Sequence, residues 1–307
     1  MERVSGAVDQ PPRDLVGYGP HPPDPRWPGG ARVAVQFVVN YEEGAENSVL
    51  NGDAGSESFL SDMVGAPSHP ARAMAMESLY EYGSRAGFWR LHRLFTRRGL
   101  PVTVFGVAQA MAANPAAVEA MLAAEWEVAS HGWRWIDYQS VPEAVEREHI
   151  ARAIATHRSL TGERPLGWYQ GRTSPNTARL VAEEGGFLYD ADSYADDLPY
   201  YDRRHQQPGR RPQLIVPYTL EANDMKFVAL NGFVTADQFA AYLIDTFEGL
   251  RAEGGRMMSV GLHGRIAGRP ARAAAVARFA DHVIASGDAW VARRIDIARH
   301  WLKEHPA

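Results

Sequence analysis

Three segments far apart in the chain carry side chains that could do acid–base chemistry. Glu42 and Glu43 form an adjacent acidic pair, and His131 and His263 each stand next to a glycine. Each segment follows an apolar run that predicts a strand, at 33–39, 126–129 and 257–262. Because α/β barrels assemble their active sites at the carboxyl ends of parallel strands, we expect these side chains to meet in one site.

The residue four positions after His131 indicates whether the predicted hydrolase would bind a metal. A His-x-x-x-His pair on such a scaffold would bind a divalent metal, but the second position is Trp135. The chain has no cysteine, so histidine and carboxylate side chains are the ligands that a metal would have to use. We therefore predict a hydrolase without a metal or other cofactor, while Asp137 leaves residual metal binding open.

Composition bounds the partners that the chain can have. The sequence of 307 residues is 45% hydrophobic and 22% charged, which is typical of a soluble globular protein. A formal net charge of −5 argues against nucleic acid or an anionic membrane as the main partner. The first residues lack an apolar signal-peptide core, and no segment approaches the ~20 apolar residues of a membrane span. We expect a cytoplasmic enzyme that acts on a small molecule.

The order of predicted elements indicates an α/β fold in one domain spanning 1–307. Residues 1–31 are rich in Pro and Gly and predict an extended N-terminal arm. Strands and helices then alternate, and an irregular stretch at 45–75 is long enough to be a binding loop or lid. Further strands are expected at 102–107, 167–169, 187–190 and 214–218, and helices at 85–98, 115–124, 142–160, 174–184, 235–252 and 270–286. This alternation predicts a closed or nearly closed barrel, with a doubly wound open sheet as the alternative.

The order of the site motifs resembles that of the polysaccharide deacetylase superfamily. Its members carry an acidic pair, a His-x-x-x-His segment, an arginine loop, an aspartate loop and a late Leu-x-His segment. The counterparts in this sequence are Glu42 with Glu43, His131 with Trp135, Arg172, Asp190 or Asp192, and His263. The resemblance implies a distorted (β/α) barrel with one strand fewer than eight. It also implies that Glu43 and His131 match ligand positions of the superfamily's metal site, and two ligands fall below the three typical of catalytic zinc.

Longer segments are similar to one branch of that superfamily, the metal-independent allantoinases of bacterial urate breakdown. The similarity runs from about 12 to 306, and the segments that carry it are 40–44, 78–85, 131–138, 161–169, 217–225 and 268–272. Several long motifs in one order are more specific than any single motif. The resemblance implies hydrolysis of allantoin to allantoate by a cytoplasmic homo-oligomer, with a tetramer as one expected size, and no required metal.

Opening a hydantoin ring needs a base that activates water, stabilisation of an oxyanion and an acid for the departing nitrogen. Glu42 matches the catalytic aspartate of the superfamily, so we expect it to be the general base. Glu43 beside it should raise its pKa toward neutrality, unless both are solvated loop acids. His263 matches the histidine that acts as acid or oxyanion stabiliser, and a purely structural histidine is the alternative.

Four further side chains are expected to bind or orient the substrate. Glu43 and His131 would position water and substrate. Trp135 would fill the metal side of the pocket and offer a flat face to a small heterocycle, with plain core packing as the alternative. Arg172 would grip a carbonyl or ureide oxygen with its fork of donors, or else form a structural salt bridge to an acidic partner such as Asp190.

Other functions are compatible with parts of the sequence. A related cyclic imide or hydantoin hydrolase would need only an altered loop. A metal-dependent polysaccharide deacetylase is disfavoured by Trp135 and by the lack of a recognisable export signal. A non-catalytic binding protein would need neither Glu42 nor His263. Asn223 and Asp224 are weaker site candidates, with loop structure or lid contacts as their expected roles.

Overall fold

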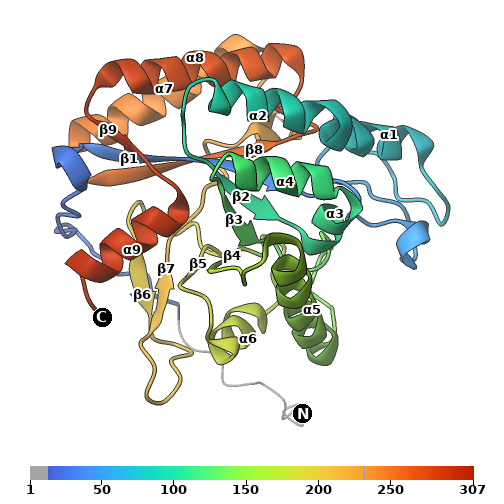
Figure 1. The fold of residues 1–307 in the computed structure, drawn as a ribbon, viewed down its shortest axis with the longest axis horizontal. Coiled ribbons are helices and arrows are strands. Elements are labelled where there is room, and N and C mark those ends of the chain that lie inside the picture. Colours follow the sequence, from blue (N-terminus) through green and yellow to red (C-terminus); the bar gives the residue numbers. More distant parts are fainter. Residues whose placement is uncertain (1–12, 231) are drawn as a thin grey trace, which may run out of the picture.

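A curled sheet, nine-stranded over the described residues, forms the centre of the molecule (Figure 1). The structure is a computed structural model that describes residues 13–230 and 232–307. The strands are β1 (Val33–Tyr41), β2 (Thr103–Gly106), β3 (Glu127–Ser130), β4 (Gly167–Trp168), β5 (Tyr189–Asp190), β6 (Tyr200–Asp202), β7 (Gln213–Ile215), β8 (Arg256–His263) and β9 (Ala289–Val291). Eight of them follow one another in the order β6-β7-β5-β4-β3-β2-β1-β8, and β9 pairs with β1.

This sheet is the distorted barrel that the sequence predicts. Within the described residues, seven of the eight strands on the path run parallel, and the edge strand β6 is antiparallel to β7. Strand β1 lies between β2 and β8, so the first and last long strands are neighbours, as in a barrel. On the open side, Asn223 forms a parallel bridge with Gly261 and brings the segment after β7 beside β8. The doubly wound alternative is wrong, because the strand order shows no reversal at a switch point.

Helices cover the outside of the sheet (Figure 1). They are α1 (Met74–Tyr82), α2 (Phe88–Thr96), α3 (Ala108–Ala113), α4 (Pro115–Ala123), α5 (Glu143–Thr161), α6 (Thr177–Glu184), α7 (Ala236–Glu253), α8 (Pro270–Ser286) and α9 (Arg294–Glu304). The helix expected at 85–98 begins at 88, and a π-helical turn, Gly83–Gly87, joins it to α1. The sequence did not predict five short elements, which are helices α1, α3 and α9 and strands β6 and β9. None of them exceeds 11 residues, which is too short for a clear periodic pattern. No helix in the described part of the chain is long and apolar enough to cross a bilayer.

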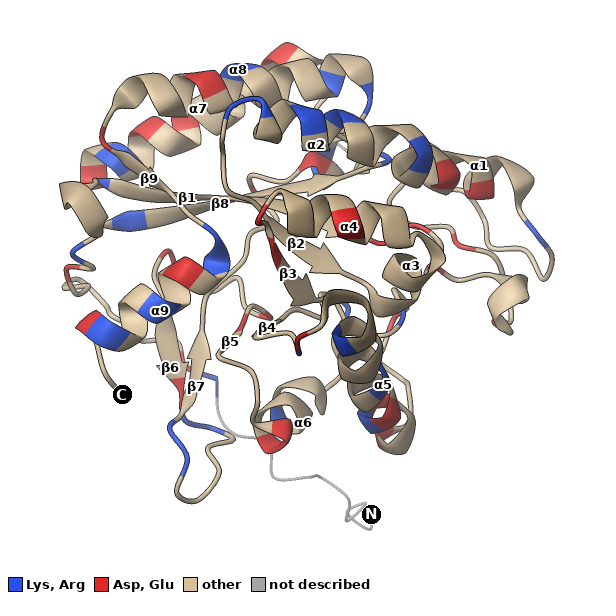
Figure 2. Ribbon diagram, viewed as in Figure 1, with Lys and Arg blue, Asp and Glu red and all other residues tan. Residues whose placement is uncertain are grey.

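Strand β1 is buried along its whole length, as its nearly continuous apolar run predicts. The ring of Phe37 lies 4.9 Å from that of Phe95 in α2 and 6.0 Å from that of Phe279 in α8, between ring centroids. Figure 2 shows that charged residues lie mainly on the surrounding helices and loops, while the strands carry few. The catalytic-type residues that follow β1 therefore start from a rigid, closely packed element.

The described part of the N-terminal arm, 13–31, lies on its own domain. The Tyr18 hydroxyl donates a 2.6 Å hydrogen bond to the carbonyl oxygen of Pro199. The buried Trp27 donates from Nε1 to the carbonyl oxygen of Arg256 at 2.9 Å. The first part of the predicted arm, 1–12, lies outside the described residues.

Candidate active site

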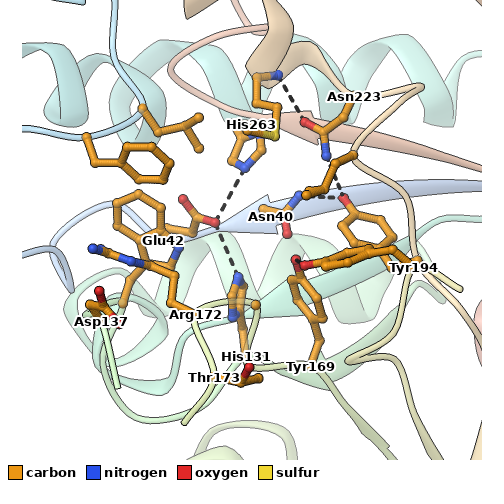
Figure 3. A pocket seen from close by; sticks show the side chains of 17 residues that line it. Asn40, Glu42, His131, Asp137, Tyr169, Arg172, Thr173, Tyr194, Asn223 and His263 are labelled. Atoms are coloured by element: carbon orange, nitrogen blue, oxygen red, sulfur yellow. Dashed lines mark hydrogen bonds and ion pairs between the residues drawn. The ribbon is translucent and has the colours of Figure 1, made fainter. Parts of the chain in front are cut away.

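The carboxyl ends of the parallel strands surround a cavity of about 480 Å³ (Figure 3). Glu42 follows β1, His131 follows β3, Arg172 lies in the loop after β4, and His263 ends β8. The lining includes these four side chains and Trp135, so the structure brings together five of the six predicted site residues. It also includes aromatic side chains that the sequence did not single out for the site: Phe59, Tyr169, Tyr194 and Tyr218.

Glu42 lies at the centre of the site. Its Oε1 is 3.2 Å from His131 Nε2 and 3.5 Å from His263 Nε2, and both contacts are drawn as dashed lines in Figure 3. Its Oε2 accepts a 2.7 Å hydrogen bond from Arg265 Nη2. Glu42 is only 1% exposed, so these contacts are made almost without competition from water. A buried carboxylate with three nitrogen neighbours is held in one orientation.

The pKa of Glu42 departs from the expectation of a raised value. Burial alone would raise this pKa, but the charges of Arg265 and His263 and the hydrogen bond from His131 hold it well below the usual range. The expectation is wrong for Glu42 because a guanidinium, and not the neighbouring carboxylate, is the main charge facing it. Burial does raise the pKa of Glu43, with the Glu42 charge adding to the effect and Arg265 opposing it. Glu42 is therefore ionised at neutral pH and able to accept a proton.

His263 is held by Asp224, a fully buried aspartate that the sequence suggests as a weaker candidate with a loop or lid role. The Asp224 carboxylate accepts a 2.5 Å hydrogen bond from His263 Nδ1 and a 2.7 Å hydrogen bond from the His263 backbone N–H. Burial would lower the pKa of His263, but the charges of Asp224 and Glu42 raise it to about 9. At neutral pH His263 is protonated, with Nε2 facing Glu42 in the cavity. The expectation for Asp224 is wrong because its partner lies 39 residues away along the chain.

Glu43 does not line the cavity, although the sequence predicts that it orients substrate. Its Oε1 accepts a hydrogen bond of 3.2 Å from the backbone N–H of Arg265 and one of 3.5 Å from Arg265 Nη1. Its Oε2 accepts the backbone N–H of Glu42 at 3.3 Å. Adjacent side chains on an extended backbone point to opposite sides, so Glu42 and Glu43 do not both face the cavity. Glu43 ties the end of β1 to the turn after β8.

Trp135 lines the cavity and at the same time packs in the core. It is 4% exposed, and its ring stacks on Phe59 with centroids 6.0 Å apart and planes 16° apart. The guanidinium carbon of Arg172 lies 5.1 Å from the Trp135 ring centroid and 5.3 Å from that of Phe59. Tryptophan, phenylalanine and arginine thus form one continuous wall with a cationic edge.

Arg172 forms a salt bridge, as the predicted alternative states, but its partner is not the Asp190 given there as an example. The acidic partner of Arg172 is Glu57, with 3.7 Å between Nη1 and Oε2. Asp190 is buried, and its Oδ1 accepts the backbone N–H of Asp192. Arg172 Nη1 is buried and makes no hydrogen bond within the described residues, and the same holds for His131 Nδ1. Both nitrogens lie in residues that line the cavity, where a bound molecule could satisfy them.

A polar wall of amide and hydroxyl groups completes the site, and of its members the sequence suggests Asn223 alone, as a weaker candidate. Asn40 Nδ2 donates to the Tyr218 hydroxyl at 3.0 Å, and Asn223 Nδ2 lies 3.5 Å from the same oxygen. The hydroxyls of Tyr169 and Tyr194 are 3.0 Å apart. Asn40 ends the apolar run of β1, which is the one signal that could have marked it, because polar residues at the ends of parallel strands face such sites.

The side chains at the site do not fit a divalent metal. In the part of the chain that the structure describes, no group of three or more His, Asp or Glu side chains is arranged to hold one. Glu42 Oε2 is engaged by the guanidinium of Arg265, and a fixed cation there would repel a metal ion. Asp137, the suggested substitute ligand, lines the cavity, but its Oδ1 accepts the backbone N–H of Gln139 at 2.9 Å.

Comparisons with known proteins point to one family. The family model described as polysaccharide deacetylase matches residues 71–187. A Schizosaccharomyces pombe protein named "Putative polysaccharide deacetylase" is 42% identical over 313 residues, which cover 96% of this chain and 98% of that protein. The crystal structure of PuuE allantoinase is similar with a TM-score of 0.94 at 55% identity, covering 96% of this chain and 99% of that one. A "probable Polysaccharide deacetylase" from Pseudomonas aeruginosa PAO1 gives 0.93 at 56% identity, with the same two coverages.

Proposed function

The chain belongs to the polysaccharide deacetylase family, and we propose that it is a cyclic amide hydrolase that opens the hydantoin ring of allantoin without a required metal. The observation that carries the proposal is the pairing of Glu42 Oε1 with His263 Nε2, 3.5 Å apart beside a cavity of about 480 Å³. The 55% identity to a structure named as an allantoinase, over 96% of this chain, supports the choice of substrate. The product would be allantoate, formed in the breakdown of urate.

The size and lining of the cavity suit a small polar heterocycle. Pockets for small molecules typically span about 300–1,000 Å³ and combine apolar walls with a few polar groups. Here the aromatic walls are joined by the amides of Asn40 and Asn223 and the hydroxyl of Tyr218. A ring with carbonyl and N–H groups offers the acceptors and donors that these side chains need. Arg172 would bind a carbonyl or ureide oxygen, and His131 would help to orient the ring.

Glu42 and His263 would divide the proton transfers between them. Water attacks a ring carbonyl carbon while Glu42 Oε1 accepts its proton, so that a C–O bond forms and the carbonyl oxygen becomes an oxyanion. Protonated His263 stabilises this oxyanion, and its Nε2 then gives a proton to the ring nitrogen as the C–N bond breaks. The proton on Glu42 returns to His263 across their 3.5 Å separation and restores both groups. The net change is the addition of one water molecule across the C–N bond.

The test is allantoin hydrolysis by protein treated with a strong chelator, with the metal content measured on the same sample. We expect full turnover without metal, and a loss of about 100-fold or more in folded Glu42→Gln protein. Turnover that vanishes on chelation and returns with zinc would refute metal independence. Turnover of other hydantoins or cyclic imides, but not of allantoin, would overturn the substrate. Ligand binding without any turnover would favour a non-catalytic binding protein.

We also propose that the protein works as a homo-oligomer, with a tetramer as the expected size, in the cytoplasm. Two apolar side chains on the segment before α7 support this, because Leu230 is 86% exposed and Val234 is 84% exposed. A contact between subunits that covers these side chains would remove their apolar surface from water. Light scattering after size-exclusion chromatography measures the mass directly, and a monomer at assay concentration would contradict the proposal.

A further inference from the structure

We infer that Arg265 positions the catalytic carboxylate, acting as a fixed cation behind Glu42. Its guanidinium holds Oε2 of Glu42, so that Oε1 is the oxygen left to face His131 and His263. Arg265 does not line the cavity itself, so it is a positioning residue and not a substrate ligand. The inference rests on the proposed function for the reaction that Glu42 serves, but the contacts of Arg265 stand without it.

The guanidinium of Arg265 is fixed by a contact from each of its three nitrogens. Its side chain is 1% exposed. Nη2 donates to Glu42 Oε2 at 2.7 Å, Nη1 lies 3.5 Å from Glu43 Oε1, and Nε donates to the carbonyl oxygen of Leu60 at 2.9 Å. A planar guanidinium bound at three nitrogens has little freedom to turn, so it also fixes the direction of the Glu42 carboxylate.

The turn that carries Arg265 is held by two buried carboxylates. The backbone N–H of Arg265 bonds to Glu43 Oε1 at 3.2 Å, and the backbone N–H of Ala267 bonds to Asp224 Oδ2 at 2.8 Å. Asp224 also accepts the hydrogen bond from His263 Nδ1. Asp224 therefore supports both His263, the acid of the proposed reaction, and the turn that carries Arg265. A shift of this turn would move both side chains.

Glycines allow the backbone of this turn to contact the backbone of the π-helical turn Gly83–Gly87 directly. A Cβ on Gly87 would overlap the carbonyl oxygen of Gly264, and so would a Cβ on Gly268. A Cβ on Gly83 would overlap Glu43 Oε1. Single π-helical turns inside helical segments are frequent at functional sites. Here the turn supplies the close approach that brings Arg265 against Glu42.

Two aromatic rings cover the guanidinium. Its carbon Cζ lies 4.3 Å from the ring centroid of Tyr80 and 5.0 Å from that of Trp135. Aromatic faces attract a guanidinium and keep water from it. Trp135 also lines the cavity, so one ring contacts both the space for substrate and the cation. This gives Trp135 a role that neither of its predicted alternatives contained.

The charge of Arg265 keeps Glu42 in the form that the reaction needs. The titratable groups facing Glu42 are Arg265, His131, His263 and the adjacent Glu43. Burial would raise the pKa of Glu42, and the Arg265 charge is the largest of the influences that lower it. Without this charge the pKa of Glu42 would rise, and protonated Glu42 cannot accept a proton from water. The rate of turnover should then fall while substrate binding persists.

The kinetic test compares Arg265→Ala and Arg265→Lys with the control Arg98→Gln, which removes a surface ion pair with Asp281. We expect Arg265→Ala to lose about 100-fold in kcat with little change in KM, and added guanidinium ion to restore part of the loss. Guanidinium should not rescue Glu42→Gln, and Arg98→Gln should behave as the parent. A rise in KM at unchanged kcat, or full activity of Arg265→Ala, would overturn the inference. If the alanine variant does not fold, Arg265→Lys decides, because an ammonium keeps the charge but cannot hold both glutamates, so its kcat should still fall about tenfold.

An infrared measurement tests Arg265 without using turnover, so its failure and that of the allantoinase proposal can be told apart. At neutral pH, Arg265→Gln should show a C=O stretching band of a protonated carboxyl group in addition to any such bands of the parent. Adding Glu42→Gln should remove this band, whereas adding Glu43→Gln should leave it. A new band that disappears only with Glu43→Gln would contradict the inference, and so would the absence of any new band. Parent protein inactive on allantoin would refute the substrate but leave this result intact.

Discussion

Replacing Asp224 by asparagine should move the alkaline limit of activity toward neutral pH. Burial opposes protonation of His263, yet the charges of Asp224 and Glu42 raise its pKa from 6.5 to about 9. One pKa unit corresponds to about 1.4 kcal/mol, so these charges favour the protonated form by roughly 3 kcal/mol after the cost of burial is met. An asparagine has no charge, and the larger part of this stabilisation should disappear. The carboxamide is of nearly the same size, so the packing around it is preserved.

The direction of the effect follows from the raised pKa. The parent keeps His263 protonated below about pH 9 and loses the proton as the pH rises through that value. If protonated His263 is the acid, kcat of the parent should hold to about 9 and fall above it. In Asp224→Asn the pKa should return toward or below 6.5, so kcat should already decline near neutral pH.

The assay is the pH dependence of kcat for allantoin hydrolysis at constant ionic strength, with thermal unfolding recorded for each protein. Asp281→Asn serves as the matched control, because Asp281 is 60% exposed in its side chain and pairs with Arg98 at the surface. Its profile should overlay that of the parent. An alkaline limit near 9 that persists in folded Asp224→Asn would refute the assignment of His263 as the acid and of Asp224 as its support.

Other perturbations test the same geometry. The free energy of unfolding should fall as pH rises from about 6.5 to 9, because the raised pKa of His263 in the folded state gives stability that is lost as His263 deprotonates. Urea titrations measure this fall, and it should be absent from His263→Gln. Arg172→Lys should raise KM about tenfold with little change in melting temperature, since the ammonium keeps a charge facing Glu57 but loses the fork of donors. Steady-state kinetics and calorimetry measure the two effects, and a large fall in melting temperature at unchanged KM would contradict the role of Arg172 in binding. Trp135→His restores a His-x-x-x-His pair. We nevertheless expect no stoichiometric zinc by elemental analysis, because Arg265 holds Glu42 by a 2.7 Å hydrogen bond. Tightly bound zinc would contradict the conclusion that this site does not fit a metal.

The position of a polar residue after a buried strand proved to be the most useful sequence signal. Glu42, His131 and His263 each follow an apolar run, and parallel strands that end at one edge bring such residues together. The long strands β1 and β8 and the long helices were predictable for the same reason, because their patterns extend over several turns or residues. Strand β6 has three residues and exists through its pairing with β7, which the local sequence does not contain.

The parts that could not be predicted depend on contacts between distant segments. Arg265 stands only two positions after His263, yet its partner Glu42 lies 223 residues away. Asp224 reads as a loop residue until its contact with His263 is known. Glu43 is adjacent to Glu42, and this adjacency suggested like-charge repulsion, whereas the folded chain places a guanidinium against both carboxylates. Neighbours in space, and not in sequence, set the pKa of each group.

The ion pair between Glu42 and His263 contributes to the lowered pKa of Glu42 and to the raised pKa of His263, beside the larger effects of Arg265 on the first and of Asp224 on the second. A carboxylate with a low pKa is a weak base, which by itself argues against Glu42 as the group that takes a proton from water. During the proposed attack, however, protonated His263 turns to the forming oxyanion and stabilises the negative charge of Glu42 less. The proton affinity of Glu42 then rises at the stage when it must hold a proton, although Arg265 remains in place. Once product has left, the ion pair at 3.5 Å is again the favoured state, so the proton returns from Glu42 to His263 without an external acid or base.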